Sequence, residues 1–151
     1  MTSGGRVIAF DHAVRVATEW VDDIADAYRT DDLAFAYRLL RAWLHRLSER
    51  LSADATVHFA AQLPELLRGI HFEGWNPNRV PERYGVEEYI ERFARDAGIA
   101  VRDVSTAAAT VTAVAGRHLA PGQVDKALAQ LPTDLRALLR ARTPVEQHES
   151  E

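Results

Sequence analysis

Apolar residues recur at three- and four-residue steps through most of the chain, which is the spacing of one buried helix face. The first stripe predicts a helix whose buried positions are Phe10, Ala13, Val14, Ala17, Val21, Ile24 and Tyr28. A second stripe predicts a helix from about Asp32 to Leu51, capped by Thr30 or Asp31, with buried positions Leu33, Ala36, Tyr37, Leu40, Trp43, Leu44 and Leu47. No segment shows the convincing alternation of a strand. The pattern therefore predicts an all-α protein.

Proline and glycine indicate where the next helices begin and end. A third helix is expected to begin at Ser52 or Asp54 and to end near Leu63, because the residue before Pro64 avoids the helical region. Pro64 then opens a short helix that Gly69 closes. These assignments predict a sharp corner at the Gln-Leu-Pro sequence.

The second half of the chain follows a long break. Turn residues interrupt residues 71–85, and helical spacing then resumes up to Gly98, which fits a left-handed cap. Residues 101–116 are rich in alanine and β-branched residues and predict a thin, closely packed helix. Two further helices are expected to begin at prolines. The first should run from Pro121 to Leu131, and the last should begin at Pro132.

The two halves share a repeated pattern. Residues 51–70 align without gaps on the segment that begins at Leu119, and the identical residues of the first copy are Leu51, Ala61, Gln62, Leu63, Pro64, Leu67 and Arg68. The preceding helices pair large residues (Leu40, Trp43, Leu47) with small ones (Ala108, Val111, Ala115). We therefore expect one compact helical-bundle domain over residues 9–142, made of two pseudo-repeated units, 9–70 and 86–142, joined by a junction, 71–85. Residues 1–8 and 143–151 are expected to be flexible ends.

Three segments carry a family resemblance: AYRLLRAWLHRLSERL, AAQLPELLRGIHFEGWNP and ALAQLPTDLRALL. Together they combine a Leu-Arg-Ala helix, two Gln-Leu-Pro corners and an Arg-Gly-aromatic-Glu-Gly-Trp junction. In this combination, over residues 9–142, the chain resembles the bacterial family called domain of unknown function 2267 (DUF2267), with His71-Phe72 where the pattern often has two aromatic residues. The resemblance implies an all-helical, soluble bacterial protein, often encoded among stress-associated functions. It carries no catalytic residues over to this chain.

Composition narrows the function classes. The 151 residues, 47% hydrophobic and 26% charged, suit a globular domain, and the lack of cysteine excludes disulfides, thiolate metal sites and a cysteine nucleophile. No apolar run approaches the ~20 residues of a membrane span, and the N-terminus lacks the plan of a signal peptide. A cytoplasmic location without a membrane partner is therefore expected. The net charge of −4 argues against nucleic acid as a partner.

The candidate binding residues lie where the first unit meets the junction: Arg68, His71, Glu73 and Trp75. In one interpretation, Arg68 holds an anion while His71 and Glu73 handle a proton or a metal, in a cleft between the two units. In the other interpretation, Phe72 and Trp75 plug the groove, Arg68 pairs with Glu73, and the His71 imidazole lies at the groove rim. The matching Arg136 lacks the sequence that follows Arg68, which favours the second interpretation.

Other chemistry has weaker support. The six histidines form no HxxxH or HExxH pair, and no GxSxG, GxGxxG or GxxxxGK motif occurs, so no catalytic residue, metal or cofactor is expected. His45 and Glu49 lie four residues apart, which is typical of an exposed hydrogen-bonded pair. An arginine-rich face on the second helix is interpreted as solvated surface rather than a nucleic-acid interface: Arg38, Arg41, Arg46 and Arg50.

Two function classes follow. The leading hypothesis is a non-enzymatic module that binds a protein partner or a second copy of itself, with aromatic residues as anchors. The alternative is a small-molecule or anion-binding protein, or an enzyme, whose pocket lies between the units around Arg68, His71 and Glu73. Convergence of those three side chains on a pocket would favour the alternative. A filled junction with an exposed apolar helix face would favour the module.

Overall fold

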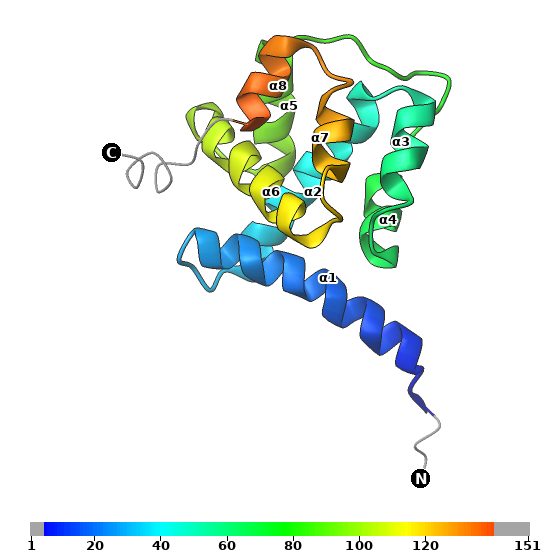
Figure 1. The fold of residues 1–151 in the computed structure, drawn as a ribbon. Helices are drawn as coiled ribbons and strands as arrows, with labels where there is room; N and C mark the ends of the chain where they lie inside the picture. The colour runs from blue at the N-terminus through cyan, green and yellow to red at the C-terminus, as the bar shows by residue number, and fades with distance from the viewer. Residues whose placement is uncertain (1–4, 141–151) are drawn as a thin grey trace.

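The computed structural model describes residues 5–140, which form helices joined by short turns and one long junction (Figure 1). The elements are α1 (Ile8–Ala27), α2 (Leu33–Arg50), α3 (Ala53–Ala60), α4 (Glu65–His71), α5 (Val86–Ala97), the 3-10 turn η2 (Val101–Asp103), α6 (Val104–His118), α7 (Gln123–Leu128) and α8 (Thr133–Arg140). No strand occurs within residues 5–140, and the predicted all-α class is confirmed. The expected flexible tail, 143–151, lies outside the described residues, as do residues 1–4 of the expected flexible N-terminus.

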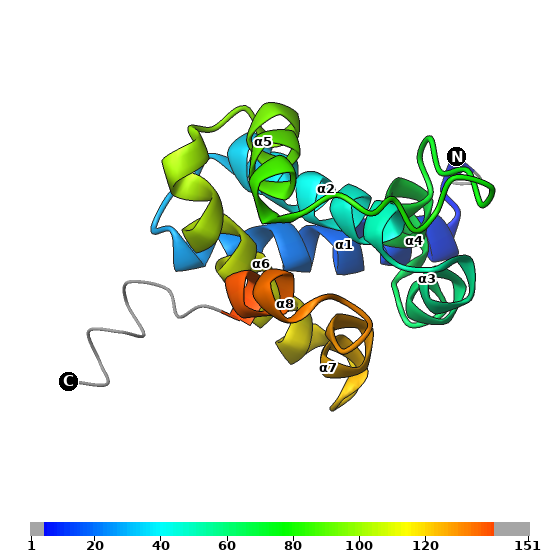
Figure 2. The same cartoon turned by 90° about the horizontal axis from the view of Figure 1, so that it is seen from above.

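Helix α2 is the centre of the domain. It packs against α1, α4, α5 and α6, and Figure 2 shows it between α1 and α5. Its apolar residues at 1% exposure or less are Ala36, Leu39, Leu40, Ala42, Trp43, Leu44 and Leu47. A helix covered on so many sides has little solvated face left. The polar side chains of α2 must therefore also find partners within the protein.

Side-chain caps set the beginnings of α2 and α3. The Asp32 carboxylate accepts a hydrogen bond from the backbone N–H of Phe35 at 3.1 Å, so α2 begins one residue later than a cap at Asp31 would place it. Ser52 caps α3 in the same way, as its sequence position predicts. Both caps satisfy backbone N–H groups that have no partner inside the helix.

Helix α6 can approach α2 closely because its buried side chains are small. Ala108, Val111 and Ala115 are fully buried, and so is the larger Trp43 of α2. The Trp43 indole N–H donates to the Thr112 hydroxyl at 3.0 Å, which gives this buried polar atom a partner. The predicted thin helix is confirmed, although it starts as the 3-10 turn η2 and continues to His118.

Two similar corners join α3 to α4 and α7 to α8. Leu63 and Leu131 are buried at the corners, with 2% and 3% exposure. The Arg68 guanidinium donates to the Leu63 carbonyl and that of Arg136 donates to the Leu131 carbonyl, both at 3.0 Å. These matching contacts agree with the alignment of the two segments. The equivalence of the two whole units stays a prediction.

Several predicted helix ends are wrong. Helix α3 ends at Ala60 and α7 at Leu128, three residues earlier than expected, because the N–H groups of Leu63 and Leu131 close tight turns onto those two carbonyls at 3.0 Å. Helix α7 begins at Gln123, so Pro121 lies in the preceding turn.

The glycine predictions have mixed outcomes. Helix α4 runs through Gly69 to His71, so Gly69 does not close it. The chain turns at Gly74 instead, where φ is 68° and favours glycine. Gly98 has the expected left-handed conformation, also with φ 68°, and the Ile99 N–H bonds to the Ala94 carbonyl at 3.0 Å.

Helix α1 packs on the domain from Ala13 onward, and its large buried side chains lie in its C-terminal half. Trp20 and Ile24 are buried, and the Trp20 ring stacks on His118 with centroids 4.9 Å apart. Phe10 and Val14, which the apolar stripe predicts to be buried, are 69% and 55% exposed. The prediction is wrong there because the free end of α1 extends beyond the helices that would cover it (Figure 1).

The corner leucines give a test of the fold. Leu63→Ala and Leu131→Ala should each lower the free energy of unfolding by about 2–5 kcal/mol, because each removes a buried side chain and leaves a cavity. Val57→Ala is the control, since Val57 is 54% exposed in the same region. Urea unfolding measures all three. Losses below about 0.5 kcal/mol at both corners would contradict the burial described above.

Candidate functional site

The Arg68 side chain serves a backbone role. Its Nε–H donates to the Ala60 carbonyl and an Nη2–H to the Leu63 carbonyl, both at 3.0 Å. These carbonyls belong to the C-terminal end of α3 and the following turn, where carbonyls lack helical partners. The expected ion pair between Arg68 and Glu73 is not formed, and this prediction is wrong.

His71 lies inside the protein and not at a groove rim. It is 0% exposed, its Nδ1–H donates to the Leu44 carbonyl at 3.0 Å, and its Nε2 has no hydrogen-bond partner. Burial lowers the pKa of the imidazole to about 4, although the bond to the Leu44 carbonyl opposes this shift and the nearby His45 adds to it. The neutral ring packs edge-on against Phe59. The interpretation that places the imidazole at the groove rim is therefore wrong.

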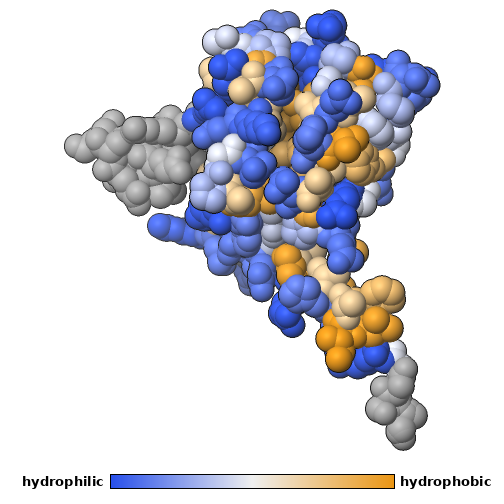
Figure 3. Space-filling model, turned by 45° about the vertical axis from the view of Figure 1, so that its right-hand side comes forward, coloured by the Kyte–Doolittle hydropathy of each residue, from blue (hydrophilic) through white to orange (hydrophobic). Residues whose placement is uncertain are grey.

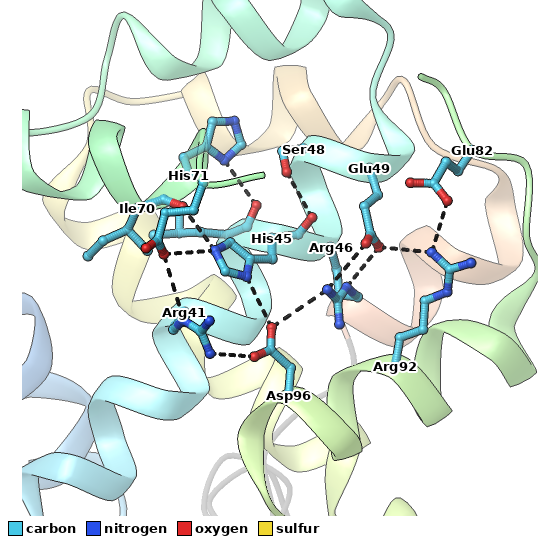
Figure 4. A network of polar contacts seen from close by, with 12 residues as sticks. Arg41, His45, Arg46, Ser48, Glu49, Ile70, His71, Glu82, Arg92 and Asp96 are labelled. Atoms are coloured by element: carbon cyan, nitrogen blue, oxygen red, sulfur yellow. Dashed lines mark hydrogen bonds and ion pairs between the residues drawn. The ribbon is translucent and has the colours of Figure 1, made fainter. Parts of the chain in front are cut away.

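Glu73 lies beside Arg41 and His45 of α2 rather than beside Arg68 or His71. One Glu73 carboxylate oxygen is 3.2 Å from His45 Nε2, which is also 3.0 Å from the Ile70 carbonyl (Figure 4). The other ring nitrogen, Nδ1, is 3.1 Å from Asp96, and Asp96 accepts a bond from Arg41 at 2.7 Å. His45 thus connects the end of α4 to α5.

A chain of alternating charges continues along the contact between α2 and α5. Arg46 lies 3.6 Å from Asp96 and 2.9 Å from Glu49 (Figure 4). Glu49 accepts a hydrogen bond from the Tyr84 hydroxyl at 2.6 Å and lies 3.4 Å from Arg92, whose guanidinium is 4.2 Å from the centre of the Tyr84 ring. Burial and the bond to Glu49 raise the pKa of the Tyr84 hydroxyl, so it stays a donor. We call this set the charged network; its members are Arg41, His45, Arg46, Glu49, Glu73, Tyr84, Arg92 and Asp96.

The arginine-rich face of α2 is therefore covered and not solvated, which overturns that prediction. Arg46 and Arg50 are only 7% and 8% exposed. Arg38 donates to the Ala97 carbonyl at 3.0 Å, and Arg50 donates to the Glu82 carbonyl. Helix α5 and the junction lie along this face, so these four arginines already have hydrogen-bond or ion-pair partners within the fold. His45 and Glu49 likewise are not the expected exposed pair.

The junction also places its two aromatic rings at the surface. Phe72 and Trp75 are half-buried and pack edge to face, with centroids 5.1 Å apart. Trp75 lines a polar cavity of about 310 Å3 whose walls include His45, Arg46 and Glu49. Those three groups are paired with one another or with neighbours, and within residues 5–140 no group of three acidic or histidine side chains is placed to hold a metal. The four candidate residues therefore do not converge on one ligand.

A second feature is an apolar groove of about 440 Å3 between α1, α2 and α4. The candidate residues chosen from the sequence do not include it. Val14 and Val21 form one wall, and Leu33, Tyr37 and Leu66 form the other. Leu33, Tyr37 and Leu66 are 45%, 38% and 43% exposed. We call this groove, together with the free end of α1, the α1–α2–α4 surface.

The apolar surface continues along the free end of α1. Val7, Ile8 and Phe10 are 51%, 83% and 69% exposed, and Figure 3 shows hydrophobic side chains gathered at this end of the molecule. Soluble monomers rarely leave large contiguous apolar patches in water, and such patches commonly bind other proteins. The stripe in the sequence signals this face, but periodicity does not show that it is uncovered.

Comparison with protein families decides the relationship that the sequence motifs suggest. The family described as Uncharacterized conserved protein (DUF2267) matches residues 17–138, most of the chain. The chain belongs to the DUF2267 family. Comparison with curated proteins gives no match. The DUF2267 match includes the charged network and most of the groove, and it begins after the free end of α1.

Within residues 5–140, no helix of this DUF2267 protein combines enough length and enough apolar character to cross a bilayer.

The charged network predicts different roles for two glutamates that both pair with Arg92. Glu49→Gln should lower the free energy of unfolding by about 1–3 kcal/mol, because it removes the counter-charge of the buried Arg46. Glu88→Gln is the matched control: Glu88 pairs with Arg92 at the surface, and its loss should cost below about 0.5 kcal/mol. Equal effects in chemical denaturation would contradict a structural role for the network.

Because the His71 imidazole is buried and neutral, the protein is expected to lose stability in acid. The pKa of the imidazole is about 4 in the folded protein against 6.5 when unfolded, so between these values the unfolded chain binds a proton that the folded chain does not. Stability should fall as the pH drops from about 6.5 to about 4, and by pH 4.5 wild type should lose roughly 2–3 kcal/mol more than His71→Asn, which keeps a donor for the Leu44 carbonyl. His58→Asn, at an exposed site, should behave as wild type. A pH dependence that His71→Asn leaves unchanged would contradict the buried neutral imidazole.

Proposed function

We propose that this protein is a non-enzymatic protein-interaction module whose binding face is the α1–α2–α4 surface. One observation carries the proposal: an apolar surface lies in solvent, whereas Arg68, His71 and Glu73 each bond to other groups of the protein itself. Val14, Leu33, Tyr37 and Leu66 are more than a third exposed around one groove. Burying this surface against a partner would be favourable through the hydrophobic effect.

The shape of the surface suits a helical partner. Two walls from different helices enclose a long apolar floor that includes Ala17 and Leu67. An amphipathic helix binds such a groove by side chains at three- and four-residue steps. Tyr37 adds an aromatic ring at the groove, and aromatic rings are common anchors of interfaces.

A small-molecule site remains the alternative function. The structure gives no support to a pocket at Arg68, His71 and Glu73, because these side chains bond to separate parts of the fold. A different cavity, of about 340 Å3, lies between α3 and α7 and is lined by His58, Lys126 and glutamine side chains. It would take a small polar ligand. Saturable binding of such a ligand that His58→Ala and Lys126→Ala abolish would favour this alternative.

The type of organism and the cellular location of the protein are part of the same proposal. The family resemblance implies a bacterial, stress-associated protein, and a cytoplasmic location belongs to the same proposal. A regulatory role through protein contact is consistent with the DUF2267 match, whose description names no activity.

Photo-crosslinking in native cells tests the proposal. We would replace Tyr37 or Leu66 by p-benzoylphenylalanine and, as a control, replace the exposed Val57, which lies outside the surface. Irradiation should link the protein covalently to a partner from positions 37 and 66 but not from 57, and mass spectrometry would identify the partner. If neither groove position yields a protein adduct, the surface is not a binding face and the proposal is wrong.

A further inference from the structure

We infer that the partner seated on the α1–α2–α4 surface is a second copy of this chain, bound by antiparallel pairing of the two α1 helices. The inference rests on the proposed function and adds the identity and geometry of the partner. Its basis is that α1 supplies both halves of a complementary pair: an exposed apolar ridge at its free end and one wall of an apolar groove further along.

The spacing of the ridge matches the spacing of the groove wall. Val7, Phe10 and Val14 form the ridge, and Val14, Ala17 and Val21 line the groove. With a two-fold axis at Val14, Val7 of one copy faces Val21 of the other, and Phe10 faces Thr18, next to Ala17 in the groove lining. The large Phe10 ring then lies against a small side chain, as close helix packing requires. Both copies make the same contact, so the interface closes as a dimer.

Charge along α1 favours the antiparallel direction. Its first half carries cationic or titratable groups, Arg6, His12 and Arg15, with Asp11 bonded to Arg6 at 3.0 Å. Its second half carries four acidic residues: Glu19, Asp22, Asp23 and Asp26. Antiparallel pairing brings each basic end near the acidic half of the other copy, whereas parallel pairing would bring the acidic halves together. His118 lies 2.6 Å from Asp23 and engages only one of the four.

The exposed area is of the size that a dimer needs. The fractional exposures of the ridge and of Leu33, Tyr37 and Leu66 correspond to roughly 600 Å2 of apolar side chain per copy, against about 800 Å2 per partner in a standard interface. Flanking polar residues would supply the rest.

Sedimentation velocity on the purified full chain tests the dimer. We expect a mass about twice the 16.8 kDa of the chain. The double variant Phe10→Glu/Val14→Glu should sediment as a monomer with an unchanged helical circular dichroism spectrum, because both side chains are exposed. Val57→Glu, an equal apolar-to-acidic change elsewhere, should remain a dimer. A monomeric wild type at about 100 µM, a double variant that stays dimeric, or a Val57→Glu variant that dissociates equally would each overturn the inference.

Cysteine cross-linking tests the antiparallel register, since the chain has no cysteine of its own. Val14→Cys lies on the proposed axis and should form a disulfide-linked dimer on mild oxidation, because a disulfide needs Cα atoms within about 7 Å. Val7→Cys alone should not cross-link, but a mixture of Val7→Cys and Val21→Cys should. Efficient cross-linking of Val7→Cys alone, or none in the mixture, would overturn the antiparallel geometry.

The two proposals fail in different ways. A monomeric chain that still cross-links to another identified protein from positions 37 and 66 would overturn the second copy as partner and leave the interaction module standing. A chain that forms no adduct with any protein, itself included, would overturn both.

Discussion

The fold depends on the burial of the polar side of α2. Arg46 and Glu49 lie next to a helix face whose other residues, such as Trp43 and Leu47, are fully buried. Removing charges from water is costly unless each meets a partner of opposite charge or a carbonyl. Asp96 of α5 lies 3.6 Å from Arg46, and the Tyr84 hydroxyl of the junction donates a hydrogen bond to Glu49 at 2.6 Å. The positions of α5 and of the junction are therefore tied to the charges of α2 as well as to its apolar residues.

The same constraint explains why the residues that look chemical are structural. Arg68 bonds to carbonyls left open at the end of α3, and the buried His71 bonds to a carbonyl of α2. A basic or acidic side chain that satisfies buried backbone groups is not free to bind a ligand. We therefore propose the binding face elsewhere, at the α1–α2–α4 surface, where apolar side chains within residues 5–140 remain exposed around a groove.

Periodicity and caps predict the helices because both act locally. The caps at Ser52 and Gly98 are each set by one side chain or one backbone conformation, and both were predicted. The covered arginine face could not be predicted, because contacts between two polar faces leave no apolar signal in either helix. The candidate site shows the same limit: Glu73 and His45 are 28 residues apart, and nothing in the sequence pairs them. Their partners follow from tertiary packing alone.

Helix α1 shows what an apolar stripe in a sequence predicts and what it does not predict. The stripe tells which residues share a face, and only the structure tells that Phe10 and Val14 on that face have no cover. A disagreement between local pattern and burial is expected at functional positions. Because ridge and groove wall both come from α1, a substitution at Val14 alters both sides of a two-fold interface in both copies at once. In the proposed dimer, the contact between copies therefore depends on few residues of α1, while the core behind that helix is formed by other side chains.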